Sequence, residues 1–166
     1  MRSIRLASLL VLTATLVAPN ARAGIADSPL PVLSAGATTF HLYSVPGVIA
    51  GGGGLSTFFS CTSTDTATMQ VGVELFASAG GAPDNDAVAT SLSVGPGATV
   101  IFGTGGAAGI SISSNLGGFF SKGSARILAT SKQLACTAFL ADDGNAPPTS
   151  MAQLTIIKKT TQKAAN

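Results

Sequence analysis

The most constraining feature of this sequence is the frequency of turn-forming residues, which leaves only short stretches between one turn signal and the next. All 20 glycines follow residue 23, and serine and threonine recur in every segment. These residues disfavour helix interiors, whereas valine, isoleucine, threonine and phenylalanine suit a pleated sheet. No stretch shows the sustained apolar spacing of an amphipathic helix. The sequence therefore predicts an all-β protein.

About nine stretches have the pattern of strands, and turn signals separate them at intervals of roughly 8–15 residues. The clearest covers residues 69–76, where Val71, Val73 and Leu75 share one side of the strand. We expect strands at residues 38–43, 55–61, 69–76, 87–94, 98–102, 109–113, 124–129, 134–141 and 153–158. Such a series predicts a single β-sandwich of about eight or nine mainly antiparallel strands.

The first 23 residues have the layout of a signal peptide. Arg2 and Arg5 precede an uncharged apolar stretch at residues 6–18, and Ala21-Arg22-Ala23 offers the small residues that a signal peptidase requires. The apolar stretch is shorter than the roughly 20 residues that cross a bilayer. We therefore expect cleavage after Ala23, no membrane span, and a mature protein that is secreted or periplasmic.

Cleavage at this point would change the charge of the chain. The full sequence has 9 Lys and Arg residues against 7 Asp and Glu residues. Arg2, Arg5 and Arg22 lie in the segment that would be removed, so 9 − 3 leaves 6 basic residues against 7 acidic ones. No basic patch with interleaved aromatic residues is present, so we expect no nucleic-acid partner.

The chain divides into four parts by pattern. Residues 1–23 are the expected signal peptide, and residues 24–37 contain Pro29 and Pro31 without a clear periodicity. We expect this second part to be an extended segment. Residues 38–158 carry the strands of the sandwich domain, and residues 159–166 are expected to form a flexible polar tail.

Cys61 and Cys136 are the only cysteines, and export would place them in an oxidising compartment. Each stands in a strand pattern on an apolar face, Cys61 with Phe59 and Cys136 with Leu134. We expect a Cys61–Cys136 disulfide that passes through the core of the sandwich. Two free buried thiols are one alternative. A redox site is another, disfavoured because there is no C-x-x-C pattern and no nearby histidine.

Two glycine-rich stretches invite comparison with phosphate-binding loops. Residues 103–108 have the glycine spacing of a dinucleotide-binding loop. However, a strand pattern follows instead of a helix, and no acidic residue lies between Asp86 and Asp142 to hold a ribose. We therefore expect a flexible hairpin loop and no cofactor. Residues 51–54 lack the Gly-Lys-Ser/Thr ending of a phosphate loop and are expected to form a mobile connection.

His41 is the only histidine. Alternation places it with Tyr43, opposite Phe40 and Leu42, on the expected solvent side. The sequence contains no G-x-S-x-G elbow for a serine nucleophile. One histidine also cannot supply the copper set of two histidines and a cysteine. The sequence therefore indicates no catalytic residue and no metal site at His41.

Four carboxylates, Asp84, Asp86, Asp142 and Asp143, gather in two turn-like sequences. Such side chains commonly stabilise turns locally. Their oxygen atoms are also the ligands that an extracellular Ca²⁺ ion prefers. Because the spacing matches no EF-hand loop, solvated turns are the leading interpretation and a calcium site is the alternative.

Glu74 and Arg126 are lone charges inside apolar strand patterns. We expect both to face solvent, either separately or as an ion pair across the sheet. Glu74 has no acidic partner in its own strand, so a hydrolase with paired carboxylates is not indicated.

Five short motifs follow one another along the expected sandwich. They are Phe-x-Cys-Thr at residues 59–62, Val-x-Val-Glu at 71–74, Pro-Gly-x-Thr-Val at 96–100, Gly-Ser-Ala-Arg-Ile at 123–127 and a second cysteine strand at 135–138. Together they resemble a loosely defined group of small, mostly uncharacterised exported bacterial proteins. Ser63 stands where that group often has asparagine. The resemblance implies a β-sandwich, immunoglobulin-like in architecture only because the core tryptophan is absent, and it brings no functional residue.

These observations favour an exported, non-catalytic protein that serves as a structural or interaction module. Its expected partner is an unknown envelope or extracellular protein, or a second copy of the chain bound through a sheet edge. The alternative is a small-ligand or glycan-binding module of the cell envelope, disfavoured by the absence of tryptophan and the single tyrosine. A hydrolase with an unrecognised site, using His41 as its base, is a third reading.

Overall fold

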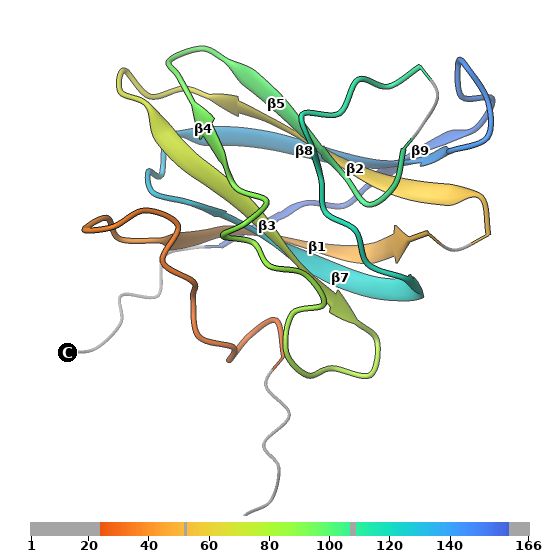
Figure 1. Cartoon of the computed structure of the whole chain (residues 1–166), viewed down its shortest axis with the longest axis horizontal. Helices are drawn as coiled ribbons and strands as arrows, with labels where there is room; N and C mark the ends of the chain where they lie inside the picture. The colour runs from red at the N-terminus through yellow and green to blue at the C-terminus, as the bar shows by residue number, and fades with distance from the viewer. Residues whose placement is uncertain (1–23, 52, 107–108, 160–166) are drawn as a thin grey trace, which may run out of the picture.

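A computed structural model describes residues 24–51, 53–106 and 109–159. The expected signal peptide and residues 160–166 of the expected tail lie outside the described residues. Within the described ranges every regular element is a β-strand, which confirms the predicted all-β class. The strands form two layers that pack face to face (Figure 1).

Each layer is a five-stranded sheet. Sheet A has the strand order β10-β1-β7-β3-β4, and sheet B has the order β6-β5-β2-β8-β9. Neighbouring strands are antiparallel except for β5 and β6, which are parallel. The strands are β1 (Phe40–Ala50), β2 (Leu55–Ser63), β3 (Met69–Ala77), β4 (Leu92–Val94), β5 (Thr99–Gly103), β6 (Ser114–Asn115), β7 (Phe120–Ala129), β8 (Leu134–Asp142), β9 (Met151–Leu154) and β10 (Ile157–Lys158).

The strands expected at 38–43 and 124–129 are longer in the structure, since β1 extends to Ala50 and β7 begins at Phe120. Three other predicted strands are shortened, misplaced or divided. The strand expected at residues 87–94 is reduced to β4, because the Asp86 carboxylate accepts hydrogen bonds from the Val88 and Ala89 amides and stabilises a turn there. The strand expected at 109–113 is wrong, since β6 begins only at Ser114. The stretch expected as one strand at 153–158 belongs to β9 and β10, which lie in different sheets.

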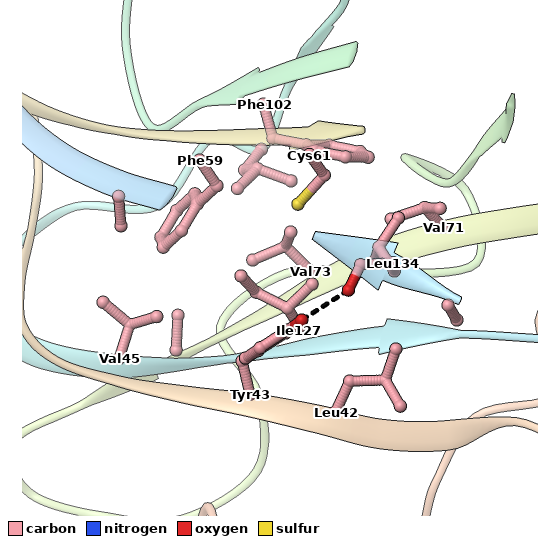
Figure 2. Close-up of a cluster of buried hydrophobic side chains, with 14 of the residues drawn as sticks. Leu42, Tyr43, Val45, Phe59, Cys61, Val71, Val73, Phe102, Ile127 and Leu134 are labelled. Atoms are coloured by element: carbon pink, nitrogen blue, oxygen red, sulfur yellow. Dashed lines mark hydrogen bonds between the residues drawn. The ribbon is translucent and has the colours of Figure 1, made fainter. Parts of the chain in front are cut away.

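The main core lies between the two sheets. Its side chains include Leu42, Tyr43, Val45, Phe59, Cys61, Val71, Val73, Phe102, Ile127 and Leu134 (Figure 2). The Tyr43 hydroxyl donates a hydrogen bond to the Leu134 carbonyl and so joins sheet A to sheet B. The expectation that Tyr43 faces solvent is wrong, because a register shift between His41 and Tyr43 brings both Leu42 and Tyr43 into the core.

The Cys61–Cys136 disulfide is present, as the sequence predicted, but it does not connect the two sheets. Cys61 in β2 lies directly opposite Cys136 in β8, its neighbour in sheet B. The Asp143 amide donates to the Gly54 carbonyl at 3.0 Å, so Gly54 and Asp143 form a hydrogen-bonded pair of the β2–β8 ladder. Bonded and non-bonded pairs alternate along the ladder, and the cysteine pair lies an odd number of positions from this bonded pair. The cysteines are therefore a non-hydrogen-bonded pair, which agrees with their Cα separation of 4.2 Å.

Residues 24–39, which we call the strap, lie across the outer face of sheet A. The buried Leu33 side chain packs closely on Gly72 of β3. A Cβ atom at Gly72 would lie 3.0 Å from Leu33 Cδ2 and 3.1 Å from the Ala87 carbonyl oxygen. Glycine therefore allows the strap and the residues before β4 to approach the sheet, and β3 is buried on both faces.

Under the strap lies a buried ion pair between Glu74 and Arg126. The two residues are direct cross-strand partners in β3 and β7, and their side chains are joined by a hydrogen bond. The Arg126 guanidinium also donates to the Ser28 carbonyl at 2.8 Å and the Pro29 carbonyl at 2.9 Å, and it stacks over the Phe76 ring. The expectation that both charges face solvent is wrong, since Glu74 is 4% exposed and Arg126 is 1% exposed.

Candidate functional site

Two of the four aspartates of the expected turns, Asp86 and Asp142, use their carboxylates in local hydrogen bonds. Asp86 caps the turn before β4, and Asp142 accepts hydrogen bonds from Thr149 and Asn145. These hydrogen bonds lower the pKa of Asp142 below its ordinary value, Thr149 contributing most. In the described part of the chain, no three His, Cys, Asp or Glu residues come together as metal ligands. Calcium binding by Asp84, Asp86, Asp142 and Asp143 stays the alternative to solvated turns and is untested.

Asp143 contacts the buried hydroxyl of Ser56 in β2. Ser56 is fully buried, and its Oγ lies 3.1 Å from Asp143 Oδ2. The glycine-rich turn after β5 packs directly on this hydroxyl, because a Cβ atom at Gly105 would lie 2.4 Å from Ser56 Oγ. Gly105 is therefore needed for close packing. The predicted hairpin is wrong, because the strands on either side, β5 and β6, run parallel.

The turn after β5 leads into a segment that covers part of the outer face of sheet B. Ile110 and Ile112 pack against a small apolar cluster there, which includes Phe58 and Phe139. The rings of Phe58 and Phe139 stack with their centroids 5.4 Å apart. Residues 107 and 108 of the expected loop lie outside the described residues. Gly103 and Gly105 thus serve close packing, whereas a Cβ atom at Gly106 would have no neighbour within 4 Å.

His41 is partly buried at the start of β1. Its Nε2 lies 3.1 Å from the Tyr43 carbonyl oxygen and 3.0 Å from Ser44 Oγ. Burial, followed by the positive charges of Lys159 and Arg126, lowers the pKa of His41 from 6.5 to about 4. The imidazole is therefore neutral at pH 7, and its Nε2 is already used within the fold.

We expect this histidine to make the protein less stable in mild acid. Because its pKa is lowered on folding, the unfolded chain binds the extra proton, so stability falls as the pH drops from 6.5 towards 4. Solvent screens part of the effect, and we expect a loss of about 1 kcal/mol between pH 7 and pH 5. Urea unfolding at both pH values should show this loss, and a His41→Gln variant should show less of it. An unchanged pH dependence in the variant would contradict the assignment.

A depression with a volume of about 420 Å³ lies beside the disulfide. We call it the notch. It lies where the chain leaves β9 and crosses from sheet B to sheet A. None of its lining residues is charged: Cys136, Thr137, Gln153, Leu154, Thr155 and Ile156.

The notch exists because the pairing of β8 with β9 stops early. The last paired residues are Ala138 and Leu154, so β9 does not reach Cys136. Since Cys136 is a non-hydrogen-bonded partner of Cys61, its N–H and C=O point away from β2 and towards the notch. The Tyr43 hydroxyl occupies the Leu134 carbonyl on the same side of β8. The notch therefore offers main-chain hydrogen-bonding groups as well as neutral side chains.

Among the described residues the adjoining strand β9 pairs with β8 alone, so its other edge is free. The Asp142 amide donates to the Ser150 carbonyl at 3.2 Å, which makes these two residues a hydrogen-bonded pair. Because bonded and non-bonded residues alternate in an antiparallel ladder, the N–H and C=O groups of Met151 and Gln153 point away from β8. Both side chains are exposed, Met151 by 61%.

The other edges of the two described sheets are better protected. Free edges are commonly blocked by short strands, lysines, prolines or bulges. The edge strands β4, β6 and β10 have three, two and two residues, and β10 carries Lys158. Strand β9 has four residues and contains neither a charge nor a proline. It is therefore the edge most open to another strand.

Comparison with protein-family models, with curated proteins and with solved structures found no match to this chain. Among the described residues no helix has the length and apolar character needed to cross a membrane. The candidate site therefore depends on the geometry of the β9 edge and the notch.

Proposed function

We propose that this protein is exported and serves as a non-catalytic interaction module, and that its contact surface is the β9 edge with the adjoining notch. The observation that carries the proposal is the outward-facing main chain of Met151 and Gln153 on an uncharged edge. An added strand takes its affinity from such main-chain groups and its specificity from side-chain pockets beside them. The notch is the pocket available at this edge.

The surroundings of the conventional catalytic groups support a role other than catalysis. The Ser56 hydroxyl is fully buried against Asp143 and has no imidazole among its hydrogen-bond partners. The single imidazole, His41, bonds to the main chain of its own strand. A nucleophile and its base need to be within hydrogen-bond reach of one another and of a substrate.

Export is supported by the disulfide, which persists in oxidising compartments. The expected cleavage after Ala23 would also leave the strap whole, since the Ser28 and Pro29 carbonyls that bind Arg126 lie beyond it. The Gly24 amide nitrogen lies 2.6 Å from Asp27 Oδ1. Cleavage would turn this nitrogen into an ammonium group, and its hydrogen bond to the carboxylate would become charge-assisted.

We expect the exported protein to begin at Gly24. Intact-mass measurement of the protein from the periplasm or the medium should give the mass of residues 24–166 with two hydrogens missing, as the Cys61–Cys136 disulfide requires. A protein that retains Met1, or that carries two free thiols after export, would contradict this part of the proposal.

The contact surface itself can be tested by photo-crosslinking in the producing cells. A photoreactive phenylalanine analogue replaces Met151 on the proposed edge, and a matched variant carries it at Ser93, an exposed residue on the edge strand β4. We expect a discrete crosslinked product after irradiation at position 151 and none at position 93. Equal crosslinking at both positions, or none at 151, would overturn the proposed surface.

A further inference from the structure

We infer that the strand added to the β9 edge is β9 of a second copy of this chain, placed antiparallel about a twofold axis. The inference deepens the proposed function, because it rests on the same edge and names the occupant. A twofold dimer of this kind uses the same patch on both subunits. It would extend sheet B of one copy into sheet B of the other.

The faces of the strand fix the register of such a pair. Opposed residues of neighbouring strands place their side chains on the same face of the sheet, so the two residue numbers must both be odd or both be even. The midpoint of two such residue numbers is a whole number. The twofold axis therefore passes beside one residue of β9, which lies opposite the same residue of the partner subunit. Centring it on Ala152 places Met151 opposite the partner subunit's Gln153 and keeps these pairs within the four residues of β9.

This register matches the free main-chain groups of the edge. Met151 and Gln153 are the residues of β9 whose N–H and C=O groups point outward. Each Met151–Gln153 pair between the copies is then a hydrogen-bonded pair, which exchanges two main-chain hydrogen bonds. Ala152 meets the partner subunit's Ala152 as a non-hydrogen-bonded pair, where side chains come closest and a small residue fits best.

The chemistry of the edge also favours a second copy. Strand β9 carries no charge, so two copies meet without like-charge repulsion. Met151 is 61% exposed, and in this register it packs along the aliphatic part of the partner subunit's Gln153. The contact is small, so we expect a weak and reversible dimer that forms as concentration rises towards roughly 1 mM, in the class of transient interfaces.

The test is sedimentation velocity of the disulfide-bonded protein, residues 24–166, with a charge-swap pair. Variant Met151→Lys/Gln153→Lys sets lysine opposite lysine in the proposed register, and variant Met151→Glu/Gln153→Glu sets glutamate opposite glutamate. A Ser93→Lys/Thr99→Lys variant adds the same charge at exposed residues of β4 and β5. Far-UV circular dichroism and the thermal midpoint show that each variant is folded.

We expect the wild type and the Ser93/Thr99 control to change from monomer to dimer with rising concentration. Each charged β9 variant should stay monomeric by itself, and an equal mixture of the two should form a heterodimer. A wild type that stays monomeric up to roughly 1 mM, or charged variants that dimerise alone as well as the wild type, would overturn the inference. A monomeric wild type that still gives a crosslink to another protein at position 151 would leave the proposed function standing.

Discussion

Replacing both Cys61 and Cys136 with alanine is expected to lower the free energy of unfolding by about 4 kcal/mol. The bond links residues that are 75 positions apart in the sequence, so its loss frees a long loop in the unfolded chain. It also removes the covalent link between β2 and β8, which are central neighbours in sheet B. Urea unfolding of the mature protein at pH 7 measures the change.

The matched control is the neighbouring cross-strand pair, Ser60 and Thr137. These residues lie opposite each other in the same two strands, one position along from the cysteines. Changing both to alanine should lower stability by under about 1 kcal/mol, because an ordinary cross-strand pair contributes only that much. A cysteine variant no less stable than this control would show that the disulfide does not hold sheet B together.

Removing the buried guanidinium should have an effect of similar size. An Arg126→Met variant leaves the Glu74 carboxylate buried without its partner, and it leaves the Ser28 and Pro29 carbonyls without their donor. Breaking a buried ion pair in this way costs about 3–5 kcal/mol. We expect a loss in that range from urea unfolding, together with faster proteolysis within residues 24–39.

A double variant distinguishes the effect of the ion pair on stability from the effects of the two charges taken singly. Because Arg126→Met/Glu74→Leu removes both buried charges, it should be more stable than Arg126→Met alone. Lys122→Met is the control, since Lys122 is an exposed basic residue in the same strand, and its stability should stay within about 0.5 kcal/mol of the wild type. Additive losses in the double variant would contradict a coupled buried pair.

The sequence pattern predicted strand faces correctly where buried and exposed residues alternate along the strand. In β3, Val71, Val73 and Leu75 face the core as predicted. The prediction that the outer face of the same strand is exposed to solvent was wrong, because the strap covers Glu74 and Gly72. The strap is a segment with no periodicity of its own. A charge in a strand indicates a solvent face only when nothing packs on it, and the sequence does not show what packs there.

The neighbours of each strand and their pairing register also could not be predicted from the local sequence pattern. Two apolar-facing cysteines predicted the disulfide, but its place within one sheet depends on which strands are neighbours. The shift near His41 likewise moved Tyr43 into the core, because one irregular residue reverses every later side chain. Strand neighbours and bulges are long-range properties and leave little trace in a single short segment.

The candidate site was not predicted as a site. Its location depends on the chain leaving sheet B after Leu154, which divides an expected single strand and opens the notch. One signal was present, because residues 144–157 contain no charge and no proline after Pro148. An uncharged stretch of that kind at the end of a β domain is a reason to look for an open edge.

The central claim is that the β9 edge pairs with β9 of a second copy through the main chain of Met151 and Gln153. Amide hydrogen exchange of the mature protein, resolved by residue with NMR at low and at high protein concentration, tests it most directly. The Met151 and Gln153 amides should exchange more slowly as concentration rises, while those of Ala152 and Leu154, which face β8, should not change. Exchange at Met151 and Gln153 that is fast and independent of concentration would contradict the claim.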